Sequence, residues 1–347
     1  MKVGNIHLAG IGSHVPTTVP VHDAVREGLL DRTAAEESGI ISVAVESELP
    51  AVDMAVAAAR RAIAMSGHSA EDFAALLHGG AYHQGPEGWS APHYISHRTI
   101  DRPVTAFEVR HGCLSVLSAV RMAAALLDAE ADGKAALITA ADNFSTPLVD
   151  RWRDSEHVLY ADSGCSLVLS ARGGFARLLA VGSRSEPSLE AMHRGGISLL
   201  PPERHPERPM LVEPRLKAWA ERPGAEPLDM ITSVARYGEL VAETAEQTLD
   251  EAGIGWDDIT RVAHLGLNED ALHNLLLDPI DIDPVKQGIW EYIRTIGHAS
   301  VSDMVLGLEH LWTTGQVVVG DHVLLVGGTE GMEAGCAVVR ITAPPCG

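Results

Sequence analysis

Residues 107–127 read FEVRHGCLSVLSAVRMAAALL, and this stretch decides how the rest of the sequence is interpreted. It joins a short apolar strand, predicted over residues 104–109, to a helix over 114–130 that is apolar on almost every side and therefore predicted to be buried. Cys113 stands at the junction, where the free N–H groups and partial positive charge of a helix N-terminus favour a thiolate. We predict that Cys113 is a nucleophile and that its own N–H holds a thioester oxygen as that oxygen gains charge. The alternative is a small buried cysteine that only packs at the end of a strand.

Strands and helices alternate throughout the chain. Strands are predicted over residues 3–12, 73–80, 104–109, 135–141, 166–171, 258–266, 321–327 and 335–342, and helices over 51–66, 114–130, 229–253 and 302–315. Both halves repeat this order, which predicts an α/β protein with an internal duplication, divided into residues 1–175 and 176–347. Residues 183–223 interrupt the second half with Pro, Arg and Glu and little periodicity, and we interpret them as a lid-like insertion over a site.

The charge balance and the cysteines restrict the class of function. A formal net charge of −21 opposes general binding to nucleic acid or to an anionic membrane surface. The four cysteines have neither a Cys-x-x-Cys pair nor Cys/His metal-ligand spacing, so we expect reduced thiols in the cytoplasm and no bound metal. Cys165 and Cys336 are expected in core strands and Cys346 in an inert tail. The first residues lack the pattern of a secretion signal, and no apolar run is judged long enough to span a bilayer.

A cysteine nucleophile needs a base, and the base needs a group that holds its tautomer. Among 17 histidines, two follow strand-like segments in the second half: His264 in RVAHLGLNEDAL and His298 in TIGHASVSDMVLGL. If His298 lies in the loop before the helix, the Asp303 carboxylate can reach back and orient its ring. Two alternatives stay open. Ser300 and Asp303 have the spacing of a capping box that serves only the helix end, and His264 would fit a strand end where its ring bonds to the backbone.

A glycine-rich loop, GGTEGMEAG at residues 327–335, precedes the last predicted strand. It lacks the spacing and the following helix of a phosphate-binding loop, so it is a weak signal for a nucleotide. Its backbone could line a pocket or supply a second donor to an oxyanion, and we name Gly328, Glu330 and Gly331 as candidates. A tight turn between two strands explains the glycines equally well.

Along nearly its whole length the chain resembles the type III ketoacyl synthases of the thiolase superfamily. The resemblance is carried by IHLAGIGSHVP, FEVRHGCLSVLSAV, LYADSGCSLVLS, VAHLGLN, IGHASVSDMVLGLEHLWTTGQVVVGDHVLLVGG and GCAVVR, of which the cysteine segment and the block at 296–340 are the most specific. It implies the thiolase fold, a duplicated five-layer α/β/α/β/α arrangement, and a homodimer. It also implies that Cys113 carries an acyl group, taken from coenzyme A or from the phosphopantetheine of an acyl carrier protein, with no further cofactor.

Departures from this family pattern bear on the reaction. The His-Gln-Ala-Asn motif of the decarboxylating members reads HLGL at residues 264–267, and their Gly-Asn motif reads GH at residues 297–298. The asparagine that stabilises the enolate in those enzymes is therefore replaced by a histidine. This combination resembles the synthase-like acyltransferases of secondary metabolism, which implies Cys113 as nucleophile, His298 as general base and Asp303 as the group that orients it.

The resemblance also sets the expected reaction and its rivals. His264 keeps a histidine position of the family and stays among the candidate catalytic residues, whereas the donor-positioning Arg-Thr-Gly-Ile stretch reads ESGI at residues 37–40, so donor recognition is expected to differ. We expect ping-pong transfer of an acyl group to a hydroxyl, amine or carrier thiol in polyketide or antibiotic biosynthesis. The rivals are a decarboxylating condensing synthase and a non-catalytic partner subunit. Four arginines of the lid are either a patch for an acidic carrier or ordinary solvated charge: Arg184, Arg194, Arg204 and Arg208.

Overall fold

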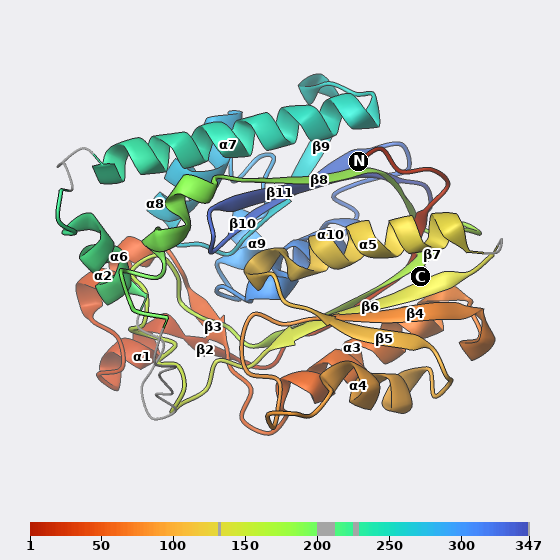
Figure 1. Cartoon of the computed structure of the whole chain (residues 1–347), viewed down its shortest axis with the longest axis horizontal. Coiled ribbons are helices and arrows are strands. Elements are labelled where there is room, and N and C mark those ends of the chain that lie inside the picture. Colours follow the sequence, from red (N-terminus) through yellow and green to blue (C-terminus); the bar gives the residue numbers. More distant parts are fainter. Residues whose placement is uncertain (131–132, 200–211, 225–228, 346–347) are drawn as a thin grey trace.

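The computed structural model describes residues 1–130, 133–199, 212–224 and 229–345, and within these ranges nine strands form one mixed sheet (Figure 1). Their order along the sheet is β5 (Thr105–Val109), β4 (Phe73–Gly79), β6 (Ala135–Asp142), β7 (Ser163–Ser170), β1 (His7–His14), β8 (Ala176–Ser185), β11 (Glu333–Ile341), β10 (His322–Thr329) and β9 (Ile259–His264). The first five strands come from the first half of the chain and the other four from the second. The two groups join where β1 pairs antiparallel with β8, with Leu8 opposite Ala176.

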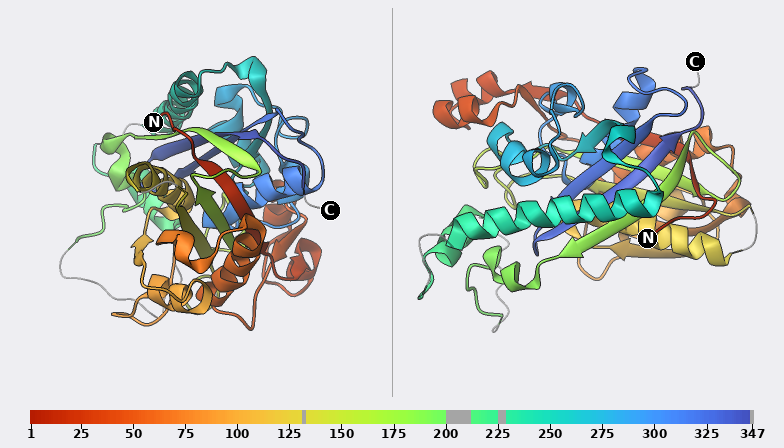
Figure 2. Two further views of the ribbon diagram at one scale, coloured as in Figure 1. Left: turned by 90° about the vertical axis from the view of Figure 1, so that its right-hand side faces the viewer. Right: turned by 90° about the horizontal axis from the view of Figure 1, so that it is seen from above.

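Helices cover the outer faces of the two strand groups and also fill the space between them. α3 (Ala51–Ser66) packs on β1, β6 and β7, and α7 (Asp229–Ala252) packs on β8 and β11 at the opposite side of the molecule. Between them lie α5 (Ser115–Ala129) and α10 (Asp303–Thr313), each of which contacts strands of both groups. Figures 1 and 2 show the resulting order of helix, strands, paired helices, strands and helix. The expected five-layer α/β/α/β/α arrangement is confirmed.

Small residues set the distance between α3 and the strand that it covers. A Cβ atom on Gly10 would overlap the carbonyl oxygen of Ala62, and one on Gly12 would lie 2.6 Å from the carbonyl oxygen of Ala58. Only glycine permits this approach of strand and helix. The small alanine side chains of α3 allow the same close contact from the side of the helix. The helix predicted over residues 51–66 is confirmed, with both of its ends.

The remaining described strands and α-helices lie around this framework. They are β2 (Thr18–Pro20), paired with β3 (Ser42–Ala44), and the helices α1 (Val21–Arg26), α2 (Arg32–Ser38), α4 (Ala91–Thr99), α6 (Glu213–Ala220), α8 (Glu269–Leu272) and α9 (Trp290–Ile293). Most of them were not predicted, because elements this short display too little periodicity to stand out in a sequence.

The segment interpreted as a lid contains regular structure. Residues 183–185 form the end of β8, where Arg184 pairs with a residue of β11, so the boundary placed at residue 183 falls inside a strand. A 3-10 helix at Pro187–Met192 and the helix α6 follow. The middle of the predicted lid, with Arg204 and Arg208, lies outside the described residues. The division of the chain at residue 175 and the role of the lid stay predictions.

One segment of the described chain, Gly112–Ala129, is long and apolar enough to cross a membrane by length and composition alone. The expectation that no apolar run reaches this length was therefore wrong. Half of the segment is buried inside the protein, and its helix α5 lies between the two strand groups. The central helix of a folded core passes the same test, because it too is apolar on nearly every side.

Candidate active site

Cys113 lies where the sequence pattern placed it, between a strand and a buried helix. β5 ends at Val109, a 3-10 turn spans Gly112–Leu114, and α5 begins at Ser115. Gly112 has φ of 47°, in the left-handed region that favours glycine. A Cβ atom there would overlap side-chain oxygens of Thr329 and Glu330. The absence of a side chain at Gly112 therefore also lets the β10–β11 turn pack beside the cysteine.

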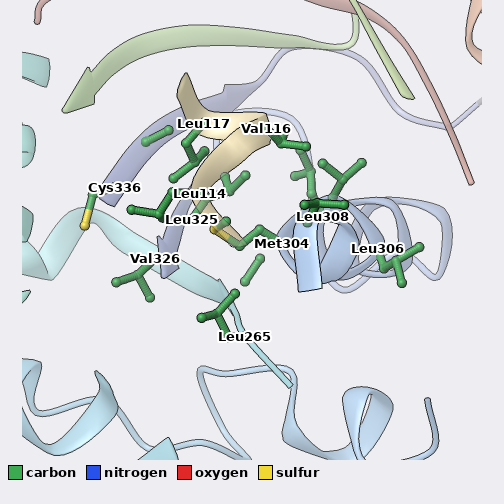
Figure 3. Close-up of a cluster of buried hydrophobic side chains, with 14 of the residues drawn as sticks. Leu114, Val116, Leu117, Leu265, Met304, Leu306, Leu308, Leu325, Val326 and Cys336 are labelled. Atoms are coloured by element: carbon green, nitrogen blue, oxygen red, sulfur yellow. The ribbon is translucent and has the colours of Figure 1, made fainter. Parts of the chain in front are cut away.

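An apolar cluster fixes the start of α5 against the second half of the chain (Figure 3). Leu114 and Leu117 project from this start, and a Cβ atom on Gly335 of β11 would approach Leu114 to 2.9 Å. Met304 of α10 lies in the same cluster and comes close to Gly327 of β10. The two central helices therefore share one core, which holds the segment before α10 next to the segment before α5.

His298 is delivered to Cys113 by the segment that precedes α10. Gly297 has φ of 86°, which forms the tight turn expected there. Backbone hydrogen bonds of 2.8 Å from the His298 N–H to Leu159 and from the Ala161 N–H to His298 then fix the main chain. The ring is buried, with 4% exposure, and its Nε2 atom lies 3.4 Å from the Cys113 Sγ atom. A sulfur–nitrogen hydrogen bond of this length places a base against the thiol of a partly exposed cysteine.

Asp303 holds the opposite side of the imidazole. Its Oδ2 atom lies 2.7 Å from the His298 Nδ1 atom and also accepts from the Gly266 N–H at 2.8 Å, and its Oδ1 atom accepts from the Ala299 N–H at 2.8 Å. The carboxylate is fully buried. The N-cap residue of α10 is Ser302, and its side chain makes no cap hydrogen bond. The contacts of Asp303 thus fit the orienting role better than the capping box that was the alternative.

Electrostatics reinforce this chain of contacts. Burial by itself lowers the pKa of His298, but the Asp303 carboxylate and the Cys113 sulfur outweigh it and raise that pKa well above its usual value. A protonated His298 beside Cys113 stabilises the thiolate by charge as well as by hydrogen bonding. The arrangement can therefore produce a nucleophilic sulfur and then return a proton to a leaving group.

His264 lies elsewhere in the core. It ends β9, its Nδ1 atom lies 2.8 Å from the carbonyl oxygen of Leu265, and its Nε2 atom accepts from the Ile289 N–H at 3.1 Å. Burial lowers the pKa of His264 to about 4, so the ring is neutral near pH 7. Both ring nitrogens form hydrogen bonds with backbone groups, which agrees with the alternative that His264 lies at a strand end and bonds only to the backbone. The structure brings Cys113, His298 and Asp303 together but does not bring His264 into contact with them.

The other described cysteines lack this environment. Cys165 lies on β7 and Cys336 on β11, and both are buried. Burial raises the pKa of each thiol to about 12, which keeps them protonated and unreactive near pH 7. Cys346 lies outside the described residues. Among the described ranges, no group of His, Cys, Asp and Glu has the arrangement of a metal site.

The residues proposed for the oxyanion lie in the turn between β10 and β11. Glu330 is exposed and lies against Gly112, next to Cys113. Gly331 forms the turn with φ of 92°. Gly328 instead packs against the hydroxyl group of Tyr237 on α7. The turn therefore borders the cysteine, and its use as an oxyanion donor stays a prediction.

Two of the four lid arginines are described, and both have acidic partners. Arg184 pairs with Glu243 at 3.6 Å, and Arg194 pairs with Glu190 at 2.7 Å. Their charges are balanced within the chain, which favours ordinary solvated charge over a patch for an acidic carrier.

Sequence reasoning missed two polar side chains at this site. Ser300 was considered only as a helix cap, yet its Oγ atom lies 3.6 Å from the Cys113 Sγ atom. Asp142 ends the apolar strand β6 and is completely buried. A lone carboxylate that closes a run of apolar strand residues is the one signal that would have revealed it.

Comparisons with known proteins show the family of the chain. The family described as 3-oxoacyl-[acyl-carrier-protein] synthase III matches residues 107–187, and its C-terminal family matches residues 249–341. A solved structure named ChlB3, an acyltransferase, is 36% identical, covers 98% of both chains and superposes with a TM-score of 0.91. A search of the curated proteins found no match.

Two more distant structures show the same fold. The 3-oxoacyl-[acyl-carrier-protein] synthase III of Aquifex aeolicus is 17% identical with a TM-score of 0.74, and covers 96% of this chain and 99% of its own. Cerulenin-bound OleA of Xanthomonas campestris is 16% identical with a TM-score of 0.75, and covers 98% of both chains. Fold and site thus define a thiolase-fold enzyme of the acyl-transferring or condensing class. Within that class, the chain belongs to the 3-oxoacyl-[acyl-carrier-protein] synthase III family.

Proposed function

We propose that this enzyme is an acyltransferase that carries an acyl group on Cys113 and passes it to a hydroxyl, amine or carrier thiol in the biosynthesis of a secondary metabolite. One observation carries the proposal: an imidazole held by a carboxylate lies 3.4 Å from the sulfur, at the position where decarboxylating relatives have an asparagine. An imidazole can accept and return a proton, whereas an asparagine can only donate hydrogen bonds to an enolate.

The first half-reaction loads the enzyme. The Cys113 thiolate attacks the carbonyl carbon of an acyl thioester on coenzyme A or on a carrier phosphopantetheine, and the carbonyl oxygen becomes an oxyanion. The Cys113 N–H, together with a donor from the turn at Gly328, Glu330 and Gly331, would hold that oxygen. The oxyanion then collapses and expels the donor as a thiolate, which takes the proton of His298 and leaves as a free thiol, so that an acyl-cysteine and a neutral imidazole remain.

The second half-reaction discharges the acyl group. Neutral His298 takes the proton of the acceptor as the acceptor attacks the acyl-cysteine, and the intermediate collapses with release of the Cys113 thiolate. The imidazole ends protonated and paired again with the thiolate, so the cycle closes without net change in the enzyme. Asp303 keeps the Nδ1 proton in place throughout, which directs Nε2 toward the reacting atoms.

Similarity to a named acyltransferase supports the same assignment. At 36% identity over 98% of both chains, ChlB3 is related along the whole length of the protein. Acceptance of an acyl thioester fits the family as a whole, which supports the donor class of the proposal. A homodimer of this chain is part of the proposal, which analytical ultracentrifugation would check.

The test separates three outcomes. Purified enzyme is mixed with acetyl-coenzyme A, its intact mass is measured, and N-acetylcysteamine is then added as a thiol acceptor. We expect one acetyl adduct, mapped to Cys113, that moves to the added thiol. The adduct should be absent in Cys113→Ala and present in the matched control Cys165→Ala.

A parallel reaction with a malonyl thioester examines the rivals. Release of carbon dioxide with a longer β-ketoacyl product would assign a condensing synthase instead. Failure of every acyl thioester tried to modify Cys113 would point to a non-catalytic subunit.

A further inference from the structure

The sulfur of Cys113 has a second polar neighbour besides His298. The Ser300 Oγ atom lies 3.6 Å from the Sγ atom, and Ser300 is buried, with 1% exposure. Its φ of 51° lies in the left-handed region, which is strained for a residue with a side chain. Such strain persists where the surroundings fix the backbone, and it concentrates at functional sites. The serine is held in an unfavourable conformation with its hydroxyl beside the reacting atom.

A buried carboxyl group meets the same hydroxyl from the other side. Asp142, at the end of β6, is completely buried, β6 packs against the turn that holds Ser300, and the Ser300 hydroxyl opposes the rise of the Asp142 pKa. Its Oδ1 atom accepts from the N–H groups of Ala81 at 3.0 Å and Tyr82 at 2.9 Å and from Gln84 Nε2 at 3.3 Å. Its Oδ2 atom accepts from the Ala81 N–H at 3.2 Å, which leaves that oxygen with room for a hydroxyl donor.

A serine hydroxyl has one proton, so it cannot donate to the carboxylate and to the sulfur at the same time. We propose that Ser300 is a shared hydrogen-bond donor, which serves the Cys113 thiolate in the free enzyme and the Asp142 carboxylate in the acyl-enzyme. This inference rests on the proposed role of Cys113 as the acyl-carrying nucleophile. Ser300 is then a catalytic residue, because it touches the reacting sulfur, and Asp142 is a positioning residue that acts through it.

The exchange follows from the charge on the sulfur. A thiolate attracts the hydroxyl proton, whereas the sulfur of an acyl-cysteine is neutral and a much poorer acceptor. After acylation the hydroxyl therefore turns to Asp142. When the acyl group leaves, it turns back and stabilises the departing thiolate. No bond to carbon or sulfur changes in this step, and no proton leaves the serine.

The surroundings of Asp142 place the pKa of its carboxyl group near neutral pH. Burial, with a smaller contribution from Glu330, raises the pKa of Asp142 to about 7, although bonds from Tyr82 and Ser300 oppose the shift. Neither charge state of Asp142 is strongly favoured near neutral pH. The titratable groups around the hydroxyl come from four segments: Asp142 on β6, Cys113 before α5, His298 and Asp303 around the start of α10, and Glu330 in the β10–β11 turn.

The test measures the pH dependence of Cys113 alkylation by iodoacetamide, with the modified residue identified by peptide mass spectrometry. Ser300→Ala should move the midpoint of the rate profile up by about half to one pH unit, because the thiolate loses a donor. Asp142→Asn should move it down. The new amide can keep its oxygen on Ala81, Tyr82 and Gln84 while its NH2 donates to the Ser300 oxygen, which turns the hydroxyl proton to the sulfur.

A double variant separates the shared hydroxyl from a simple charge effect. If Ser300 transmits the influence of Asp142, the downward shift caused by Asp142→Asn should disappear in the Ser300→Ala background. An equal shift in both backgrounds would overturn the proposal, as would an unchanged midpoint in Ser300→Ala. Ser300→Gly repeats the measurement with a residue that suits the left-handed backbone, in case the alanine variant folds poorly.

Ser302→Ala is the matched control, because the hydroxyl of this buried serine in the same turn has no hydrogen-bond partner among the described residues and therefore none in Cys113. It should leave the midpoint in place. Alkylation needs neither acyl donor nor acceptor, so this result stands apart from the test of acyl transfer. If the acyl adduct of Ser300→Ala transfers normally, the proposal of a shared donor is contradicted, while the proposed acyltransferase function stands.

Discussion

Two histidines in the second half of the chain are almost completely buried, and their pKa values shift in opposite directions. His264 ends β9 with both ring nitrogens bonded to backbone groups, and burial lowers its pKa to about 4. His298 lies before α10 against Asp303 and Cys113, which raise its pKa well above the usual value. Both are influenced by the same Asp303 carboxylate, but only His298 forms a hydrogen bond with it.

Burial is common to the two histidines, so direct contact with a carboxylate and a thiol is what distinguishes the proposed base. A charge within electrostatic range of His264 does not overcome the cost of burying a protonated ring there. A carboxylate at 2.7 Å, with a thiol on the other nitrogen, does so for His298. We therefore propose that the family's histidine position serves a structural role in this chain, and that proton transfer is carried out by the residue that replaces the family's asparagine.

The largest expected effect comes from restoring the family's residue. His298→Asn should lower acetyl exchange between coenzyme A and N-acetylcysteamine by about 1,000-fold, because an amide cannot carry the transferred proton. The rate is measured by chromatography of the two thioesters. A variant that still exchanges within about tenfold of the wild type would contradict the role of His298 as the base.

Removal of the orienting charge should have the next largest effect. Asp303→Asn is expected to slow discharge of acyl-Cys113 by about 100-fold, because His298 loses both the group that fixes its tautomer and the charge that stabilises its protonated form. Acylation should be affected less. Single-turnover mass spectrometry follows both steps, and unchanged discharge would return Asp303 to a helix-capping role.

His264 should respond in stability rather than in chemistry. His264→Ala leaves the carbonyl group of Leu265 and the N–H of Ile289 without their ring partner, so the free energy of unfolding should fall by about 2 kcal/mol. Urea denaturation measures this loss. The folded variant should retain exchange activity within a few-fold of the wild type, and a loss comparable to that of His298→Asn would contradict the assignment.

The smallest expected effect is a pH dependence of that stability. The pKa of His264 is lowered to about 4 in the folded protein, so the unfolded chain binds its proton first, and stability is lost as pH falls from about 6.5 toward 4. The stability gap between wild type and His264→Ala should therefore narrow by about 1 kcal/mol between pH 7 and pH 5.5. Urea titrations at both pH values would refute this if the gap stayed constant or widened.

Much of this architecture could be predicted from periodicity. The apolar stretches that became α3, α5, β4 and β6 are long or flanked by clear breaks, and their predicted bounds agree with the structure within one or two residues. The end of β8 was mistaken for the start of a lid, because Arg184 and its neighbours look like surface loop in sequence while pairing with β11 supplies the strand. Such pairing is a tertiary contact that local composition does not record.

The candidate site was only partly accessible to the sequence. Cys113, His298 and Asp303 could be named because a strand–helix junction and a departure from a family motif are both local features. Asp142 and Ser300 could not be linked, since they are 158 positions apart and meet only through the packing of β6 against the turn before α10. His264 keeps its place in the motif, yet its ring bonds to the backbone at Leu265 and Ile289, and the sequence does not reveal those partners.

The most direct measurement compares the two histidines in one step of the reaction. Acetyl-Cys113 enzyme is prepared for the wild type, His298→Ala and His264→Ala, and its discharge by N-acetylcysteamine is timed by intact mass. We predict that discharge persists in His264→Ala and is almost abolished in His298→Ala. Discharge that persists without His298 and disappears without His264 would contradict this account.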